Sequence, residues 1–555
     1  MWLGANLGTT RWGRPLRDGG ACLLDEGGPI AAIAEERLSR KKHAGGWTRS
    51  RQYCIEIAGT TPCQIELAVL TSCCEPVRAP DSLDEYAAEL GFRVDTVSHH
   101  LAHAYSAYWP SGFDEAIVVV LDGGGNTFEQ DAPRDWWRAG REQATYYIGS
   151  GDELWEIARD FDRPYEVGFG ELYRAFTHYL GWPSSTLAGN TMALAAFGER
   201  RWPGRTLFEV DRTEARLSLP IAADPAHPIE MIQRLLSERG INAPSPRTPR
   251  SGFKQVHADL ARLAQDSLYA AVRWRLSDLV KRTGIRKVCV AGGVALNCVM
   301  IGRLLEEGVF SDVFVQPAAG DTGQCLGAAY VALMRCGGRR PAPASSFSPF
   351  LGRRYNSTDI QDGVRRIEAS RIRVDFIEGD PEITKTVAKL IAAGKTVGWF
   401  AGRSEFGPRA LGARSILADP RSVDVKKKLL SIKGREHFMP FAPSVLADSY
   451  DKYFTGSGSD TMTVAVTATS DAHKLLPAVI HHDGSARVQK VAHDQGSFAK
   501  LLRDFGEIAN LEVLLNTSFN LAGEPMVDSP ADCASAFVRS DLDCLYLDGL
   551  LIVKQ

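Results

Sequence analysis

The stretch Ala116-Ile117-Val118-Val119-Val120-Leu121-Asp122-Gly123-Gly124-Gly125 places an aspartate between an apolar run and three glycines. A short apolar run that ends at a turn signal predicts a buried strand. Residues 144–148, Ala-Thr-Tyr-Tyr-Ile, predict a second strand that returns beside the first. The sequence here therefore predicts a hairpin that carries Asp122 at the end of its first strand.

The same pattern opens the chain. Residues 2–6, 21–24 and 30–34 predict three strands, with a glycine-containing loop after the first and a Gly-Gly turn before the third. Loops of this kind let phosphates lie against backbone N–H groups. Two copies of a strand–glycine turn–strand unit predict an α/β fold, with a duplicated N-terminal domain of the actin, Hsp70 and sugar-kinase type. In such folds a nucleotide lies in the cleft between the two halves, although this analogy alone says little about chemistry.

Two histidines one helical turn apart indicate a metal site. Ser98 can cap a helix that begins at His99, and His99 and His103 then share one face of that helix. Two imidazoles and the strand-end carboxylate of Asp122 are three ligands for a divalent ion, and Asp321 follows another predicted strand. A lone His-x-x-x-His more often caps or packs, but the two aspartates favour the metal.

The composition is that of a globular protein with two or more domains, since 555 residues are too many for one core. A net charge of −3 gives no electrostatic footprint for nucleic acid. The 11 cysteines are scattered without a Cys-x-x-Cys pair, and Cys73 and Cys74 are expected to be reduced in a core. The N-terminus turns polar before an apolar signal core could form, and no apolar run reaches membrane-spanning length. We therefore expect a cytoplasmic protein without membrane contact.

The rest of the first half predicts helices around another glycine turn. Residues 153–198 and 257–283 have mainly helical patterns, and residues 287–290 predict a strand. Gly292 and Gly293 follow that strand, and a helix begins after Asn297. A strand, a Gly-Gly turn and a helix N-terminus suit ribose or phosphate, although half of such turns serve tight packing alone.

The second half differs in character. Residues 336–349 have linker composition, and residues 350–555 predict an α+β region with a strand at 396–400. A single cationic residue in this region is more often a surface salt bridge. A set of them with neutral hydrogen-bonding partners favours a phosphate pocket. That set comprises Arg409, Lys433, Arg435 and Arg487, with Ser518 and Asn520 as the neutral partners.

In this order, and over nearly the whole length, the motifs resemble those of O-carbamoyltransferases of the nodulation protein U and cephamycin carbamoyltransferase family. No single motif is specific, but together they are. They are Glu35-Glu36-Arg37 with Arg40-Lys41-Lys42-His43, His99-His100-Leu101-Ala102-His103-Ala104, Leu121-Asp122-Gly123, Ala291-Gly292-Gly293-Val294-Ala295-Leu296-Asn297, Gly407-Pro408-Arg409-Ala410-Leu411-Gly412 and Asn516-Thr517-Ser518-Phe519-Asn520.

The resemblance implies two domains and one reaction. Residues 1–340 would form a metal- and nucleotide-binding carbamoyl-transfer domain like that of tRNA threonylcarbamoyl transfer, and residues 350–555 a YrdC-like domain that forms carbamoyl-adenylate. ATP, with Mg(II), and carbamoyl phosphate would be the substrates. The carbamoyl group would go to a hydroxyl of a small natural-product or antibiotic precursor. The expected resident metal is Fe(II), and the family allows a homodimer.

The resemblance also implies site residues. The metal ligands would be His99, His103, Asp122 and Asp321. The nucleotide would contact Gly123, Gly124, Gly292, Gly293 and Asn297. Carbamoyl phosphate and the adenylate would contact Arg409, Lys433, Arg435, Arg487, Ser518 and Asn520. Lys42 falls on a basic position of the N-terminal active site, although the cluster around it could equally be a solvated helix end.

The chain departs from the family pattern in its first loop, where Arg17-Asp18 replaces His-Asp. Asn190 also stands where Lys is usual, Asn126 where an acid is usual, and Met439 where Arg is frequent. Because a guanidinium stays protonated, Arg17 would hold an anionic group and Asp18 would become the candidate base. The alternative is that Arg17 points to solvent and the loop is only remodelled. A sugar-kinase-like phosphotransferase and a catalytically drifted nucleotide-binding protein are the alternative functions.

Overall fold

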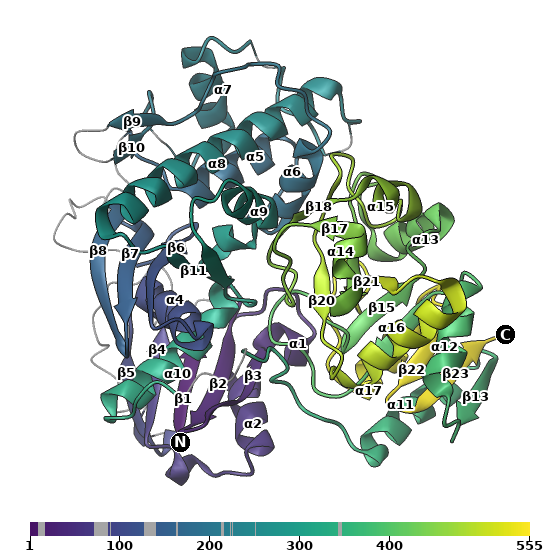
Figure 1. The fold of residues 1–555 in the computed structure, drawn as a ribbon. Helices are drawn as coiled ribbons and strands as arrows, with labels where there is room; N and C mark the ends of the chain where they lie inside the picture. Colours follow the sequence, from purple (N-terminus) through teal and green to yellow (C-terminus); the bar gives the residue numbers. More distant parts are fainter. Residues whose placement is uncertain are drawn as a thin grey trace. The chain divides into compact units, whose positions relative to one another are not determined.

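The computed structural model describes residues 1–8, 17–71, 87–88, 90–126, 140–161, 165–211, 216–222, 224, 226–242, 244–249, 251–341 and 347–555 (Figure 1). Cys73 and Cys74 lie outside these ranges. The chain divides into two compact units. The first comprises Met1–Ile30 and Ala44–Phe347, and the second comprises Ala31–His43 and Ser348–Gln555.

The first unit opens on a five-stranded sheet of order β3-β2-β1-β4-β5. Its central strand β1 pairs antiparallel with β2 and parallel with β4, and β4 pairs parallel with β5. β1 and β4 are buried along their whole length, so both faces of the sheet centre are covered. The strands are β1 (Trp2–Asn6), β2 (Gly20–Asp25), β3 (Gly28–Ala34), β4 (Leu67–Thr71) and β5 (Arg93–Thr96).

A second five-stranded sheet repeats this plan in the order β12-β11-β6-β7-β8. β6 pairs antiparallel with β7 and parallel with β11, as β1 does with β2 and β4. β11 pairs parallel with β12, as β4 does with β5. The predicted duplicated fold is therefore confirmed by topology. The strands are β6 (Glu115–Leu121), β7 (Glu142–Ser150), β8 (Glu153–Phe161), β11 (Lys287–Ala291) and β12 (Asp312–Val315).

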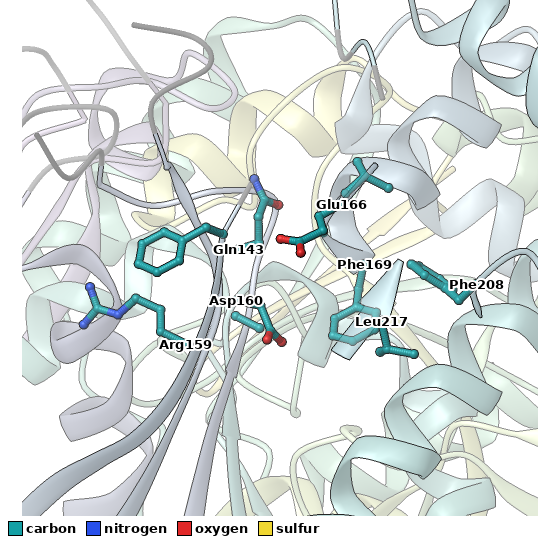
Figure 2. A pocket seen from close by; sticks show the side chains of 11 residues that line it. Gln143, Arg159, Asp160, Glu166, Phe169, Phe208 and Leu217 are labelled. Atoms are coloured by element: carbon teal, nitrogen blue, oxygen red, sulfur yellow. The ribbon is translucent and has the colours of Figure 1, made fainter. Parts of the chain in front are cut away.

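The prediction of helix for residues 153–161 was wrong, because these residues form β8. Their many charged residues resemble a helix surface. Gly151, however, adopts a φ of +59° between β7 and β8, a turn geometry that glycine accepts without strain. β8 then pairs with β7, starting at the pair Ser150 and Glu153. It takes the place in the second sheet that β3 has in the first. β8 also forms one wall of a cavity of about 130 Å³ (Figure 2).

Helices α4 (His99–Tyr108) and α10 (Gln324–Arg335) pack against one another. α10 also packs on β1, β2 and β4 of the first sheet, and α4 packs on β6 and β11 of the second. Glycines allow the close contacts. A Cβ on Gly327 would lie 1.7 Å from the Ala102 carbonyl oxygen, and a Cβ on Gly4 would lie 2.0 Å from the Cys325 carbonyl oxygen. These contacts bring the N-terminus of α10 close to α4.

The remaining helices of the first unit surround this centre. α8 contacts α5, α6 and α9, and it ends at Gly284 in the left-handed conformation. The helices are α2 (Thr48–Ile57), α5 (Phe169–Tyr179), α6 (Ala188–Ala195), α7 (Pro228–Glu238), α8 (Gln255–Thr283) and α9 (Cys298–Glu306), and a small pair of strands is formed by β9 (Glu209–Asp211) and β10 (Arg216–Ser218).

The second unit is built on a mixed eight-stranded sheet of order β13-β23-β22-β14-β15-β21-β16-β20. The central strands β14 (Val397–Phe400), β15 (Arg414–Ala418) and β16 (Ala442–Leu446) are buried throughout. The other strands are β13 (Val374–Glu378), β20 (Gln489–Val491), β21 (Val513–Ser518), β22 (Cys544–Leu547) and β23 (Leu550–Lys554).

Helices cover this sheet, as expected for an α+β region. α12 contacts α16, and α11 contacts α17. The helices are α1 (Glu35–Ser39), α11 (Ser357–Ala369), α12 (Ile383–Ala392), α13 (Val423–Lys433), α14 (Tyr450–Tyr453), α15 (Ser470–Leu475), α16 (Gly496–Ala509) and α17 (Pro530–Val538), and a separate three-stranded sheet contains β17 (Phe454–Thr455), β18 (Val466–Ala468) and β19 (Ser485–Ala486). Among the described residues, no helix is both long and apolar enough to span a bilayer.

Candidate metal centre and cation cluster

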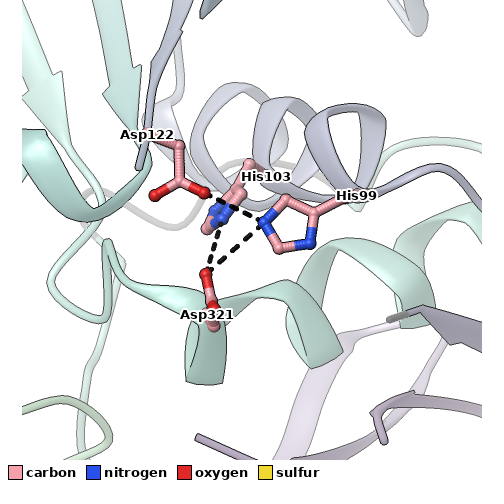
Figure 3. Close-up of side chains that lie close together, drawn as sticks. All are labelled: His99, His103, Asp122 and Asp321. Carbon is pink, nitrogen blue, oxygen red and sulfur yellow. Dashed lines mark hydrogen bonds and ion pairs between the residues drawn. The ribbon is translucent and has the colours of Figure 1, made fainter. Parts of the chain in front are cut away.

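The four predicted metal ligands converge in the first unit (Figure 3). The Nε2 atom of His99 lies 3.1 Å from Asp122 Oδ2 and 3.4 Å from Asp321 Oδ1, and His103 Nε2 lies 3.5 Å from Asp321 Oδ1. One ligand atom from each residue lies within 4.8 Å of the other three. The histidines come from α4, Asp122 from the end of β6, and Asp321 from the turn before α10.

The helix that carries the histidines begins at His99 as predicted, with Ser98 as its N-cap residue in an extended conformation. Ser98 makes no side-chain capping hydrogen bond. The His99 N–H instead donates to Asn126 Oδ1 at 2.6 Å, and the His100 N–H donates to Glu142 Oε1 at 3.3 Å. These long-range partners satisfy amide groups that a helix start leaves unpaired. They also fix the start of α4 to the glycine turn that holds Asp122.

The electrostatics of the centre are set by opposite charges. Burial alone would lower the pKa of His99, but Asp321 and Asp122 together raise it well above its usual value. Burial would raise the pKa of Asp122, and its hydrogen bond and charge interaction with His99 lower it instead. Burial and the Asp122 charge would raise the pKa of Asp321, but His99 and His103 lower it. Both carboxylates are therefore charged at neutral pH, as ligands of a divalent ion must be.

Sequence reasoning missed a glutamine at the middle of this cluster. Gln324 is buried at the start of α10. Its Nε2 lies 3.0 Å from His99 Nε2 and 3.1 Å from His103 Nε2, and it donates to Asp321 Oδ1 at 3.2 Å. The Thr71 hydroxyl donates to Gln324 Oε1 at 3.1 Å and fixes the orientation of the amide. The sequence did offer one signal for Gln324, because it follows Asp321 by three residues and so lies on the same helical turn.

The residues present fit a divalent metal ion. Two imidazole nitrogens and two carboxylate oxygens approach one another closely enough to share one ion. Nitrogen and oxygen donors in this mixture suit first-row transition metals. Gln324 and Gly293, whose N–H donates to Asp122 Oδ1 at 2.9 Å, would orient the aspartate ligands.

The predicted glycine turns lie beside the same centre. Gly292 adopts a φ of +91°, and a Cβ there would lie 2.2 Å from the Leu121 carbonyl oxygen. Gly123 and Gly124 follow Asp122 directly. Asn297 has a structural use, because its Oδ1 accepts from the Met300 N–H at 3.0 Å and its amide pairs with Gln265. Nucleotide contact by these residues remains a prediction.

The altered first loop is tied to the metal centre by its backbone. The buried Asn6 side chain donates to the Asp18 carbonyl oxygen at 3.0 Å and to the Asp321 carbonyl oxygen at 3.1 Å. Asp18 adopts a φ of +59°, and Arg17 beside it is exposed. One side chain, that of Asn6, therefore binds the backbone of both the predicted base and a predicted metal ligand. No sequence pattern indicated this link.

In the second unit, Lys433 sits at the end of α13 with only 6% of its surface exposed. Its Nζ donates to the Ser518 carbonyl and hydroxyl at 2.8 and 3.0 Å, and to the Asn520 carbonyl and Oδ1 at 3.0 and 2.5 Å. Three of the predicted anion-site residues are thus brought together. Burial, then repulsion from Arg435 and Lys42, lowers the pKa of Lys433 well below its usual value.

Arg435 and Arg487 extend this group. Burial, then repulsion from Arg487, lowers the pKa of Arg435 to about 10. Arg435 and Lys42 thus lower the pKa of Lys433, and Arg487 lowers the pKa of Arg435. We call these four residues the cation cluster. Because these like charges repel one another in a buried place, an anion bound among them would be stabilised, and the cluster favours an anionic ligand.

Lys42 belongs to the segment Ala31–His43, which groups with the second unit. Its place in the N-terminal active site, which the resemblance implies, remains a prediction. Buried Arg37 donates to the Gly407 carbonyl at 2.6 Å. Arg40 donates to the Met526 and Pro525 carbonyls at 2.7 and 2.9 Å. The segment before Lys42 is therefore fastened to the second unit by two arginines.

Arg409 lies half-buried in the loop Gly407–Gly412. That loop is shaped by the buried carboxylate of Glu405, whose Oε1 accepts from the N–H groups of Leu411 and Ala413 at 2.7 and 2.9 Å. The placement of Arg409 relative to phosphate remains a prediction. Glu405 was missed because its role is to shape a backbone, which the sequence does not reveal.

Comparisons with known proteins agree over both units. Residues 84–330 match the family model described as carbamoyltransferase N-terminus, and residues 388–554 match the model described as carbamoyltransferase C-terminus. Nodulation protein NolNO of Sinorhizobium fredii is 35% identical over 97% of this chain and 79% of that protein. Nodulation protein NolO of Bradyrhizobium diazoefficiens is 33% identical over 83% of this chain and 79% of that protein. Among solved structures, full-length HypF in its phosphate- and nucleotide-bound form matches 62% of this chain and 57% of that chain at 15% identity, with a TM-score of 0.36.

Proposed function

The chain belongs to the carbamoyltransferase family, and from this we propose that it uses ATP and carbamoyl phosphate to make carbamoyl-adenylate and then carbamoylates a hydroxyl of a small-molecule acceptor. Carbamoyl transfer follows from the family. The adenylate, the acceptor hydroxyl and the assignment of each step to a site are the proposal. The observation that carries it is the cation cluster of the second unit.

The cation cluster suits the first step. Carbamoyl phosphate carries two negative charges, and ATP brings more, so their site needs several cations. Hydrolysis of carbamoyl phosphate with one water gives carbamate and phosphate. A carbamate oxygen then attacks the α-phosphorus of ATP and expels pyrophosphate. Lys433, Arg435 and Arg487 would neutralise the phosphate charge. Lys42, which the structure groups with them, would serve the same step.

The second step requires an acceptor hydroxyl and a base. The hydroxyl oxygen attacks the carbamoyl carbon, the bond to AMP breaks, and the hydroxyl proton must leave. Asp18 is the proposed base, supported by the Asn6 side chain that ties its backbone to that of Asp321. Arg17, exposed beside it, would hold an anionic group of the acceptor or the adenylate.

His99, His103, Asp122 and Asp321 would hold a divalent ion, for which we propose Fe(II). When bound, such an ion supplies Lewis-acid stabilisation to phosphate oxygens. The chain's own part is to keep both carboxylates ionised, through His99, and to hold their orientation, through Gly293 and Gln324. Gly123, Gly124, Gly292 and Gly293, which would face the nucleotide, lie in the two turns beside this ion site.

The products of ATP separate this reaction from its alternatives. With carbamoyl phosphate and ATP, phosphorus NMR should show pyrophosphate, and an equal amount of AMP once the adenylate is transferred or hydrolysed. A sugar-kinase-like phosphotransferase would yield ADP, and a drifted nucleotide-binding protein would yield neither. Formation of ADP, or the same yield of AMP without carbamoyl phosphate, would contradict the proposed function.

A further inference from the structure

The motif Glu35-Glu36-Arg37 opens α1, and neither proposed reaction step uses it. Arg37 is only 4% exposed, and its Nη2 donates to the Gly407 carbonyl at 2.6 Å, across 370 residues of sequence. Gly407 begins the loop 407–412, which carries Arg409 and is expected to meet phosphate. Arg37 therefore binds the start of a predicted substrate loop of the second unit.

The far part of the same loop is also held by buried side chains. Glu405 Oε1 accepts from the Leu411 N–H at 2.7 Å, and Gln489 Nε2 donates to the Leu411 carbonyl at 2.8 Å. Asn516 Nδ2 donates to the Ala410 carbonyl at 3.2 Å. Glu405, Gln489 and Asn516 are each at most 2% exposed. Buried polar groups thus fix the loop backbone at both ends, and Arg37 supplies the bond at its beginning.

Charged groups of both signs are buried around Arg37. Burial lowers the pKa of Arg37, while Glu405 and then Asp528 raise it and Arg414 lowers it. Arg37 Nη1 and Glu405 Oε2 have no hydrogen-bond partner within the part of the chain that the structure describes. All four side chains are at most 4% exposed, so two cations and two anions balance one another in the interior. Loss of one member of such a group leaves an uncompensated buried charge.

The same segment carries Lys42 in a fixed turn. The His43 N–H donates to Glu36 Oε2 at 2.7 Å, which holds the chain just after Lys42. Before it, Arg40 adopts a φ of +59°, and Arg40 Nε lies 3.6 Å from Asp532 Oδ1. One short segment thus binds the loop 407–412 through an arginine and carries a member of the cation cluster.

We propose that Ala31–His43 completes the adenylate-forming site of the second unit, with Arg37 as the residue that positions the loop 407–412 for the phosphate of carbamoyl phosphate. Arg37 acts through the Gly407 carbonyl and through the charge of Glu405, without contact with the substrate. This role rests on the proposed function. Adenylate formation then depends on a residue from the N-terminal end of the sequence, which residues 350–555 do not contain.

The test measures, by isothermal titration, the binding of phosphonoacetamide to the full-length protein. This probe is a hydrolysis-resistant analogue of carbamoyl phosphate. Arg37→Met loses the bond to Gly407 and unbalances the buried charges, so both the affinity and the melting temperature should fall.

A double variant separates positioning from folding. Arg37→Met combined with Glu405→Gln leaves Arg414 and Asp528 as a balanced pair and should recover the melting temperature. Its affinity for the probe should stay about tenfold below that of Glu405→Gln alone, as expected for loss of a hydrogen bond from a charged donor. Arg421→Met is the matched control. Arg421 lies in the same unit but pairs with Asp419, so its loss should leave the affinity unchanged.

Four results would overturn the proposal: no binding by the wild type, normal affinity in Arg37→Met, equal affinity in the double variant and Glu405→Gln, or a double variant as unstable as Arg37→Met. Carbamoyl phosphate-dependent pyrophosphate exchange by the wild type is measured in parallel. Absence of exchange in a wild type that binds the probe would contradict the proposed function, while the affinities of the variants would still decide the role of Arg37.

Discussion

Replacing Lys433 by methionine should remove function at the cation cluster without removing stability. Burial lowers the pKa of Lys433, and Arg435 and Lys42 lower it further, so the fold holds this charge at a cost. Methionine removes the charge and keeps an apolar stem of similar length. The Ser518 hydroxyl still donates to Asn520 Oδ1 at 2.6 Å, so these two polar groups keep each other as partners.

We therefore expect Lys433→Met to slow carbamoyl phosphate-dependent pyrophosphate release by about 10²–10³-fold, the usual effect of losing one preorganised donor to developing charge. The melting temperature should change little. Lys426→Met is the matched control, because Lys426 lies on the same helix α13 and burial lowers its pKa too. Undiminished release in Lys433→Met, or a loss of release that follows a large fall in melting temperature, would refute this reasoning.

The lowered pKa of Lys433 also gives the prediction a pH dependence. An unfolded lysine keeps its proton to about pH 10.4, so the unfolded state binds more protons between the lowered pKa and that value. Stability should rise with pH across this window, whereas affinity for carbamoyl phosphate should fall, because the cation is lost. Lys433→Arg keeps its charge and should retain affinity to higher pH. If the affinity for carbamoyl phosphate fell over the same alkaline pH range in the wild type and in Lys433→Arg, this prediction would be contradicted.

Three further changes test the first unit. His103→Ala should reduce the metal content measured by elemental analysis and stop carbamoyl transfer, and an unchanged metal content would show that the ligand assignment is wrong. Gly327→Ala should lower stability by about 1–3 kcal/mol through overpacking and reduce metal content, because its Cβ would meet the Ala102 carbonyl at 1.7 Å. Gly189→Ala in α6 has open space and should do neither. Arg17→Ala should raise the acceptor KM without affecting pyrophosphate release, and an unchanged kcat/KM for the acceptor would remove its proposed role.

The parts of the fold that could be predicted are those with a local signal. The apolar run before Asp122, and the two hairpins that begin with residues 2–6 and 115–121, predicted the duplicated topology. The spacing of His99 and His103 placed two nitrogens on one helical face, and the structure brings both aspartates to them. Such features depend on periodicity and on turn residues close in sequence, which physical rules describe well.

The parts that escaped prediction depend on distant partners. At the start of α4, the amide of His99 pairs with Asn126, 27 residues away, and the amide of His100 pairs with Glu142, 42 residues away. Residues 153–161 have a helix-like composition, and tertiary pairing with β7 made them a strand. Ala31–His43 joins the second unit through hydrogen bonds to carbonyls several hundred residues later, as in the bond from Arg37 to Gly407.

The central claim is that carbamoyl phosphate drives adenylate formation from ATP. The most direct measurement is exchange of radiolabelled pyrophosphate into ATP in the absence of acceptor, because only a reversible adenylation step moves label in that direction. We predict exchange when carbamoyl phosphate is present and none when it is omitted. Lack of exchange with carbamoyl phosphate, in a protein that still transfers the carbamoyl group, would contradict the claim.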